Sequence, residues 1–230
     1  MRGKASGIAA VLTLPVLLAP TACGTPGAPA AATSAAARAP TSLRRAALEA
    51  GDVPGYQVSA DPLPDDAEGT PRADRAACAP LAGVMGDRPD DHARETVSRG
   101  LGSRTVPGLA VSASLSAYAA ADARHLITEL RTALSRCTAG FSTVLDGRRA
   151  AYSEVRATAY EVKGGESVSW TARVLTQGAP APVHIVVVRR GATVVRFMAI
   201  NLSAKAPPAV TVPHEIADKQ LGKLARTVRD

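Results

Sequence analysis

Aromatic residues are scarce in this 230-residue chain, which has one tryptophan, four tyrosines and two phenylalanines. Proteins that bind single-stranded nucleic acid stack its bases on aromatic side chains. The 27 lysines and arginines are scattered along the sequence, whereas a nucleic-acid interface gathers them in one patch or stripe. The composition therefore argues against nucleic acid as a partner, although the formal net charge is +7.

The chain also lacks the short motifs that identify common catalytic sites. It contains no HExxH, GxSxG, SxxK or GxxxxGK sequence. The segment GLGSRT at Gly100 begins like a phosphate-binding loop, but the third glycine is missing. The acids of the loop over 87–95 do not have the ligand spacing of a calcium site. We therefore predict no catalytic residue, no metal and no cofactor.

No apolar run is long enough to cross a bilayer as a helix, which takes roughly 20 residues. The uncharged run over 8–18 is shorter, follows Arg2 and Lys4, and leads to the small residues Thr21 and Ala22. A basic start, a short apolar run and a small-residue cleavage site make up a secretory signal. We predict a signal peptide over 1–22.

Cys23 stands directly after these small residues. The arrangement resembles the lipobox of bacterial lipoproteins, in which the cysteine thiol is acylated and becomes the mature N-terminus. On this resemblance Cys23 is a lipid anchor that holds the protein at the extracytoplasmic face of the cell membrane. Pro20 departs from the pattern, because the family prefers an aliphatic residue three places before the cysteine. An ordinary cleaved signal with a cysteine nearby is the alternative.

The next stretch, 24–40, consists of Gly, Pro, Ala, Thr and Ser with a single charge, Arg38. Without large apolar side chains it cannot bury enough surface to offset the entropy of ordering. Fully stretched, it reaches about 50 to 60 Å. We predict a disordered tether over 23–40 and one folded extracytoplasmic domain over 41–230, a size that suits a single domain.

Two cysteines remain when Cys23 is lipidated, Cys78 and Cys137. An exported protein meets an oxidising compartment, which allows the two to form a disulfide. Each also falls on the apolar face of an expected helix, so that both would point into the core. Metal binding is the alternative reading, but neither cysteine belongs to a CxxC or CxxH pair.

The spacing of apolar residues predicts helices and strands along the rest of the chain. Helical spacing favours helices within 41–50, 73–87, 120–137 and 213–228. Alternation favours strands at 56–59, 96–103, 109–117, 151–162 and 166–175, with a hairpin over 183–201 that turns at Arg190 and Gly191. The strand at 96–103 is expected at a sheet edge. Short links between successive strands imply antiparallel pairing. We predict an α+β fold with an antiparallel β-sheet of about five to seven strands, helices packed on one face, and one disulfide.

Four segments give the domain a family resemblance: CAPL from Cys78, LRTALSRC ending at Cys137, VSWTARV and VVVRRGATVVRF. Over roughly 42–228 it resembles the extracellular sensor domains of actinobacterial serine/threonine kinases and lipoproteins of the same bacteria. The resemblance implies binding through a groove without catalysis, so that no catalytic residue is carried over. Those kinase domains have two disulfides, whereas only one can form here.

Two functions are compatible with these observations. The first is a noncatalytic, membrane-anchored binding or sensor module for a lipid, a cell-wall fragment or an envelope protein. Its partners would be the membrane, through the anchor, and a small hydrophobic ligand or an envelope protein. A cleft between strands and helices would be lined by Leu130, Tyr152, Tyr160, Trp170 and Val174. The strand-face position of Trp170 is most simply that of a core residue.

The alternative is a cell-envelope hydrolase whose site is assembled in space from residues such as Asp122, His125 and His184. Four histidines occur in the chain, and none lies at a spacing that pairs it with another on one face. Ordinary surface or strand histidines therefore account for them more simply. A cluster of acids and histidines in one cleft would favour the hydrolase, and their dispersion would exclude it.

Overall fold

The computed structural model describes residues 41–60, 71–85, 92–145, 147–175, 180–203 and 209–228. The predicted signal peptide, Cys23 and the predicted tether lie outside these residues. Within the described part of the chain, no helix has both the length and the apolar character needed to cross a membrane.

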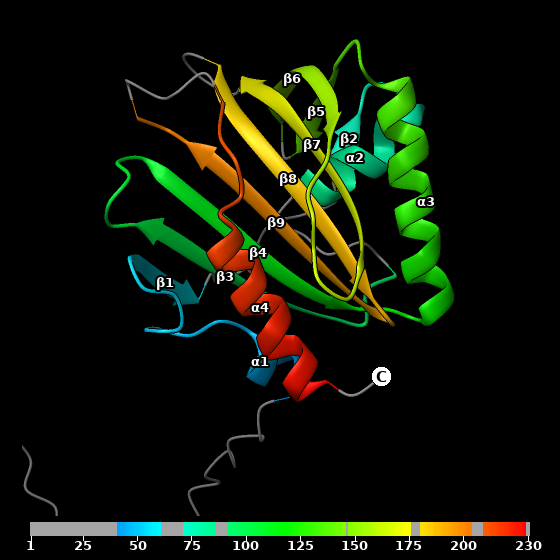
Figure 1. The fold of residues 1–230 in the computed structure, drawn as a ribbon. Coiled ribbons are helices and arrows are strands. Elements are labelled where there is room, and N and C mark those ends of the chain that lie inside the picture. The colour runs from blue at the N-terminus through cyan, green and yellow to red at the C-terminus, as the bar shows by residue number, and fades with distance from the viewer. Residues whose placement is uncertain are drawn as a thin grey trace, which may run out of the picture. The chain divides into compact units, whose positions relative to one another are not determined.

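The described residues form nine strands and four α-helices (Figure 1). The strands are β1 (Tyr56–Ala60), β2 (Arg72–Ala73), β3 (Glu95–Ser103), β4 (Leu109–Ala117), β5 (Phe141–Leu145), β6 (Arg148–Thr158), β7 (Glu166–Leu175), β8 (Ala181–Arg190) and β9 (Thr193–Asn201). The helices are α1 (Ser42–Ala46), α2 (Ala79–Met85), preceded by the short 3-10 turn η1 (Ala76–Cys78), α3 (Ala120–Arg136) and α4 (His214–Thr227).

All nine strands form one antiparallel sheet in the order β1-β3-β4-β9-β8-β7-β6-β5-β2. The antiparallel α+β class is therefore confirmed, but the predicted count of five to seven strands is too low. The two missed strands, β2 and β5, are short and show little alternation. The expectation of an edge strand at 96–103 is wrong, because β3 pairs with both β1 and β4.

The β8–β9 hairpin is the centre of the sheet and is buried on both faces. Its turn is at Gly191, where φ is +57°, a conformation that favours glycine. Adjacent residues of β9 point to opposite sides: Val195 packs in one hydrophobic cluster and Val194 in the other. On β8, Val186 and Val187 are divided in the same way. Runs of β-branched residues suit strands that must fill a core on each side.

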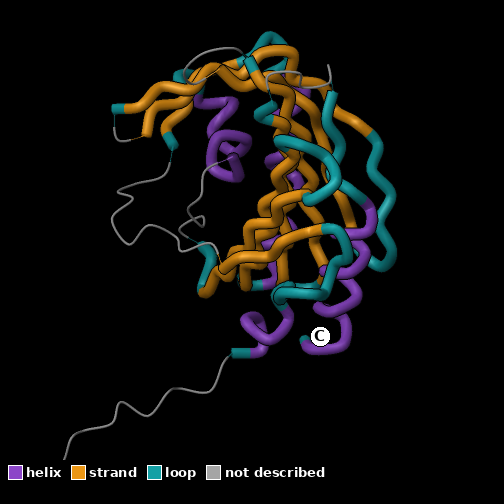
Figure 2. Tube along the Cα trace, turned by 90° about the vertical axis from the view of Figure 1, so that its left-hand side faces the viewer, coloured by secondary structure: helices purple, strands orange, loops and turns teal. Residues whose placement is uncertain are grey.

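Helices cover both faces of the sheet, which corrects the prediction that they pack on one face only (Figure 2). Helices α1 and α4 contribute Leu43, Ile216 and Leu224 to the cluster on one face. Helices α2 and α3 contribute Leu81 and Leu130 to the cluster on the other. The apolar stripe on each helix was visible in the sequence, but a stripe does not say which face of a sheet it covers.

A buried amide joins the first helix to the last. Gln220 of α4 is fully buried, and its Nε2 donates to the carbonyl oxygen of Ala46 at 2.7 Å. Its Oε1 accepts the backbone N–H of Leu48 at 3.1 Å. The side chain thereby satisfies two backbone groups where the chain leaves α1, groups that would otherwise be buried without partners.

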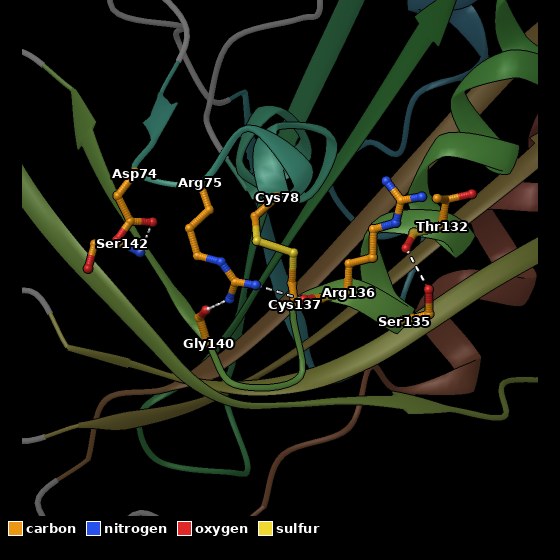
Figure 3. The surroundings of a disulfide bond; sticks show 9 residues. All are labelled: Asp74, Arg75, Cys78, Thr132, Ser135, Arg136, Cys137, Gly140 and Ser142. Atoms are coloured by element: carbon orange, nitrogen blue, oxygen red, sulfur yellow. Dashed lines mark hydrogen bonds between the residues drawn. A yellow bond between two sulfur atoms is a disulfide. The ribbon is translucent and has the colours of Figure 1, made fainter.

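Cys78 and Cys137 form the predicted disulfide, which connects η1 to the C-terminal end of α3 (Figure 3). Arg75 reinforces the same junction: its Nη2 donates to the carbonyl oxygen of Arg136 at 2.9 Å, and its Nη1 to that of Gly140 at 2.8 Å. A cation at this end of a helix also opposes the negative end of the helix dipole. The junction fixes α2 and α3 together on their face of the sheet.

Removing the disulfide should lower stability without changing the fold. We expect the double variant Cys78→Ala, Cys137→Ala to lose about 2 to 4 kcal/mol of unfolding free energy, because the unfolded chain regains the freedom that the cross-link removes. Urea unfolding followed by circular dichroism measures the loss. The wild-type protein should lose a similar amount in reducing agent, and the double variant should not respond. Equal stability of the two proteins under oxidising conditions would contradict this role.

Replacing the buried amide of Gln220 should lower the unfolding free energy by more than the change in side-chain volume alone would indicate. Gln220→Leu keeps the volume but leaves the N–H of Leu48 and the carbonyl of Ala46 buried without partners, so we expect a loss of about 2 to 4 kcal/mol. Gln220→Glu supplies an acceptor but no donor to Ala46, and should also be destabilising. Ala225→Leu, at an exposed position of the same helix, is the matched control and should change stability by less than about 0.5 kcal/mol.

Candidate functional site

A cavity of about 590 Å³ lies between the C-terminal half of α3 and the connection from β6 to β7. Helix α3 contributes Arg131, Leu134 and Ser135, followed by Thr138. The strands and their connection contribute the remaining lining residues: Ala157, Thr158, Ala159, Tyr160, Glu161, Ser167, Val168 and Ser169. The volume falls in the range of small-molecule sites in proteins.

Hydroxyl groups make up much of the polar part of this lining. Ser135 Oγ donates to the Thr132 carbonyl at 2.8 Å, and Ser167 Oγ donates to the Tyr160 carbonyl at 3.0 Å. Each hydroxyl has a single proton, which these backbone carbonyls already engage. The oxygens keep acceptor capacity, so the lining is better suited to a ligand that donates hydrogen bonds, such as one with hydroxyl or amide groups.

Behind the cavity, three side chains form a continuous hydrogen-bonded chain. His184 is buried in β8, and its Nδ1 accepts the backbone N–H of Val212 at 2.9 Å. The ring proton therefore sits on Nε2 and is donated to Thr158 Oγ1, 3.3 Å away. Thr158 in turn donates to Ser169 Oγ at 2.9 Å, because the Ser169 hydroxyl donates to the Thr158 carbonyl at 2.8 Å. Two lining residues are thus held in place by a neutral histidine.

The same histidine lies next to Tyr160, another lining residue, whose ring packs in the cluster on the side of α1 and α4. Tyr160 stacks on His214 with ring centroids 4.3 Å apart, and its hydroxyl donates to the Val212 carbonyl at 3.2 Å. Burial, with the nearby acids Asp218 and Glu215, raises the pKa of Tyr160, so the phenol stays protonated. Burial, and to a smaller extent His214, lowers the pKa of His184 to about 4.

An ion-pair network fixes the helix side of the cavity to the sheet. Glu166 at the start of β7 accepts from Arg131 Nη1 at 2.6 Å and from Arg189 Nε at 3.0 Å. Hydrogen bonds from these two arginines lower the pKa of Glu166. Arg131 is therefore oriented by Glu166 while it lines the cavity, and Arg189 ties the network to β8.

The predicted ligand-binding residues are not brought together by the fold. Tyr160 lines the cavity, but Trp170 and Leu130 are fully buried in the core between α3 and the sheet. Tyr152 stacks on Phe141 with centroids 4.9 Å apart, and Val174 packs at the edge of the same core cluster. Tyr160 belongs to the cluster on the opposite face. The simpler reading of Trp170, as a core residue, describes its position.

The residues named for a hydrolase are dispersed as well. His125 and Asp122 belong to α3, and His125 is exposed beside Glu129, with Nε2 and Oε1 3.2 Å apart. His184 is buried on the other face of the sheet, with Tyr160 and Val212. Among the described residues, no group of three or more His, Cys, Asp or Glu side chains could hold a metal ion. The hydrolase hypothesis required these acids and histidines to gather in one cleft, and the named residues do not do so.

Sequence reasoning missed the hydroxyl residues of the lining. Ser167 and Ser169 were visible as the polar side of an alternating strand, and Ser135 as a polar position of an amphipathic helix. Polar positions of this kind are usually solvated, and nothing in the sequence indicates that the end of α3 lies over the β6–β7 connection. Only the packing of α3 on the sheet creates the cavity.

No protein-family model matches this chain, and comparison with curated proteins found no match. Among solved structures, an uncharacterized protein from Mycobacterium smegmatis is similar over 77% of this chain and 90% of its own, with a TM-score of 0.41 and 15% identity. The extracellular domain of PknH from Mycobacterium tuberculosis is similar over 75% of this chain and 81% of its own, with a TM-score of 0.43 and 10% identity.

The buried histidine should make stability fall on acidification. Above pH 6.5, His184 is neutral in the folded and the unfolded chain. Between pH 6.5 and about 4, only the unfolded chain takes up the proton. The unfolding free energy should therefore drop by up to about 1.4 kcal/mol per pH unit, about 3 kcal/mol in all.

Urea unfolding from pH 7 to pH 4.5 tests this prediction. His184→Leu should be less stable at pH 7, because the N–H of Val212 loses its acceptor, but its stability should depend less on pH. His125→Gln, at an exposed histidine, is the control and should keep the wild-type slope. Equal slopes for wild type and His184→Leu would show that His184 titrates normally.

Proposed function

We propose that this chain is a noncatalytic, extracytoplasmic binding module that takes a cell-wall fragment into the cavity between α3 and the β6–β7 connection. Cys23, acylated after removal of the signal over 1–22, holds the module at the cell membrane, and 24–40 is the tether. No cofactor takes part.

The observation that carries the proposal is the mixed lining of the cavity. Leu134, Ala157 and Val168 supply apolar surface, whereas Arg131, Ser135 and Thr138 supply polar groups. A lipid chain would cover these polar groups without offering them a further hydrogen bond, which costs binding energy. A fragment that combines sugar hydroxyls with peptide amides has donors for the oxygens and a carbon skeleton for the apolar part.

A fragment of this kind should bind in the cavity and nowhere else on the domain. Residues 24–230, exported behind an unrelated cleavable signal so that the disulfide can form, would be labelled with ¹⁵N and titrated with disaccharide-peptide fragments of peptidoglycan. We expect amide shifts over 157–161 and 167–169. Native mass spectrometry of the untitrated protein would detect a ligand already bound, as an added mass that disappears on denaturation.

A bulky residue in the cavity provides the test of location. Ser135→Trp should weaken binding at least tenfold, because the indole fills space that the fragment needs. Thr132→Trp, one turn earlier on an exposed part of α3 and outside the lining, should bind as the wild type does. The proposal is wrong if the fragments cause no shifts at millimolar concentration, or if Ser135→Trp and Thr132→Trp bind equally.

A further inference from the structure

On one face of the sheet, the helices of the described residues cover only about half of the strands. On the side where α1 and α4 pack, the hydrophobic cluster draws its strand residues from β3, β4, β8 and β9. None comes from β2, β5, β6 or β7. We call the part of these four strands on that side the open face. Its residues alternate with those that point into the opposite core, such as Trp170, Val155 and Phe141.

Arginines populate the open face. Arg72 pairs with Val144, and Val144 pairs with Arg149, so that the three residues form one row across β2, β5 and β6. Farther along the strands, Arg156 lies beside Thr171, and Arg173 lies beside Ser153. Arg72, Arg149 and Arg156 are exposed, and Arg173 is half-buried, with Nη2 3.0 Å from the Pro180 carbonyl.

The opposing charge on this face is small. Among the described residues of the four strands, Glu154 is the acid on this side, and with Arg156 and Arg173 it lines a hollow of about 180 Å³. Glu166, the other acid in these strands, is engaged with Arg131 and Arg189 on the side of α3. Among the described residues of these strands, four arginines and one glutamate lie on the open face, an excess of positive charge.

Exposed apolar side chains lie among the arginines. Val144 and Leu175 are each 40% exposed, and they are two of the four exposed large hydrophobic residues in the described part of the chain. They belong to the strands on either side of β6, where Arg149 and Ala151 lie between them. In water, exposed apolar side chains among arginines add no stability to the fold. The interface of a bilayer, by contrast, accommodates both apolar and positively charged side chains.

We propose that the open face docks on a lipid surface that carries anionic headgroups. The arginines bind the phosphates, because a guanidinium matches phosphate geometry with paired donors. Val144 and Leu175 enter the boundary between headgroups and acyl chains. An anionic polymer would use the arginines equally well but would leave the apolar pair in water, so the lipid surface fits the whole face better. The inference rests on the membrane location in the proposed function, and it adds a defined orientation of the domain.

Vesicle co-sedimentation tests the proposal. Residues 24–230 lack Cys23, so any binding comes from the protein surface and not from an acyl chain. The protein should bind vesicles of phosphatidylglycerol and phosphatidylcholine, should not bind phosphatidylcholine alone, and should dissociate as salt is raised. Removing one arginine from the membrane-facing surface should lower the partition coefficient of the protein onto anionic vesicles about fivefold. The double variant Arg72→Gln, Arg149→Gln should therefore bind about 25-fold more weakly.

Matched variants separate the lipid surface from its alternatives. Arg124→Gln, Arg136→Gln removes the same charge from exposed positions of α3, away from the open face, and should bind like the wild type. Val144→Ser, Leu175→Ser should weaken binding while keeping its salt dependence. Circular dichroism confirms that each variant is folded.

Three results would overturn the proposal. The first is equal binding of wild type to charged and uncharged vesicles. The second is equal loss in the two arginine pairs, which would indicate net charge alone. The third is binding to inorganic polyphosphate that needs Arg72 and Arg149 but not the apolar pair, with no binding to vesicles. Ser135→Trp should dock on vesicles normally, so that failure of docking and failure of the cavity are distinguishable.

Discussion

The structure depends on one constraint: the β8–β9 hairpin must be covered on both faces. Its residues are apolar on each side, with Val186 and Phe197 in one cluster and Ile185 and Val194 in the other. Burying one face would leave the other in water, at a cost that scales with the exposed apolar area. Two separate pairs of helices, α1 with α4 and α2 with α3, meet this requirement from opposite sides.

Each helix pair is also joined by a specific link in addition to its apolar contacts. Gln220 connects α4 to the end of α1 through two backbone groups. The disulfide and Arg75 connect the segment before α2 to the end of α3. Both links act at a helix terminus, where backbone groups have no partner within the helix.

The two faces of the sheet are covered unequally, and this inequality produces the surfaces available for binding. Helix α3 overhangs the β6–β7 connection, and the cavity forms beneath the overhang. On the opposite side, α1 and α4 pack over β3, β4, β8 and β9, and no described helix covers β2, β5, β6 or β7. The neutral His184 lies between these regions, where it ties the segment that leads into α4 to the wall of the cavity. A ligand in the cavity and a membrane on the open face would therefore act on neighbouring parts of one sheet.

Local patterns in the sequence determined the elements of this protein and much of their orientation. Three local patterns could be read because each depends on residues close in sequence. They are the alternation of Val168, Trp170 and Ala172, the stripe of Leu126, Leu130 and Leu134, and the hairpin turn at Gly191. The cysteine pair was predicted from its number and its expected compartment.

Only the tertiary structure decided which face of the sheet each helix covers, because an apolar stripe fits either face equally well. It also decided that short segments such as β2 and β5 join the sheet, since pairing partners supply what their own pattern lacks. The cavity and the open face follow from those choices. Ser135 and Ser169 are separated by 34 positions, and nothing local relates them until α3 packs across the sheet.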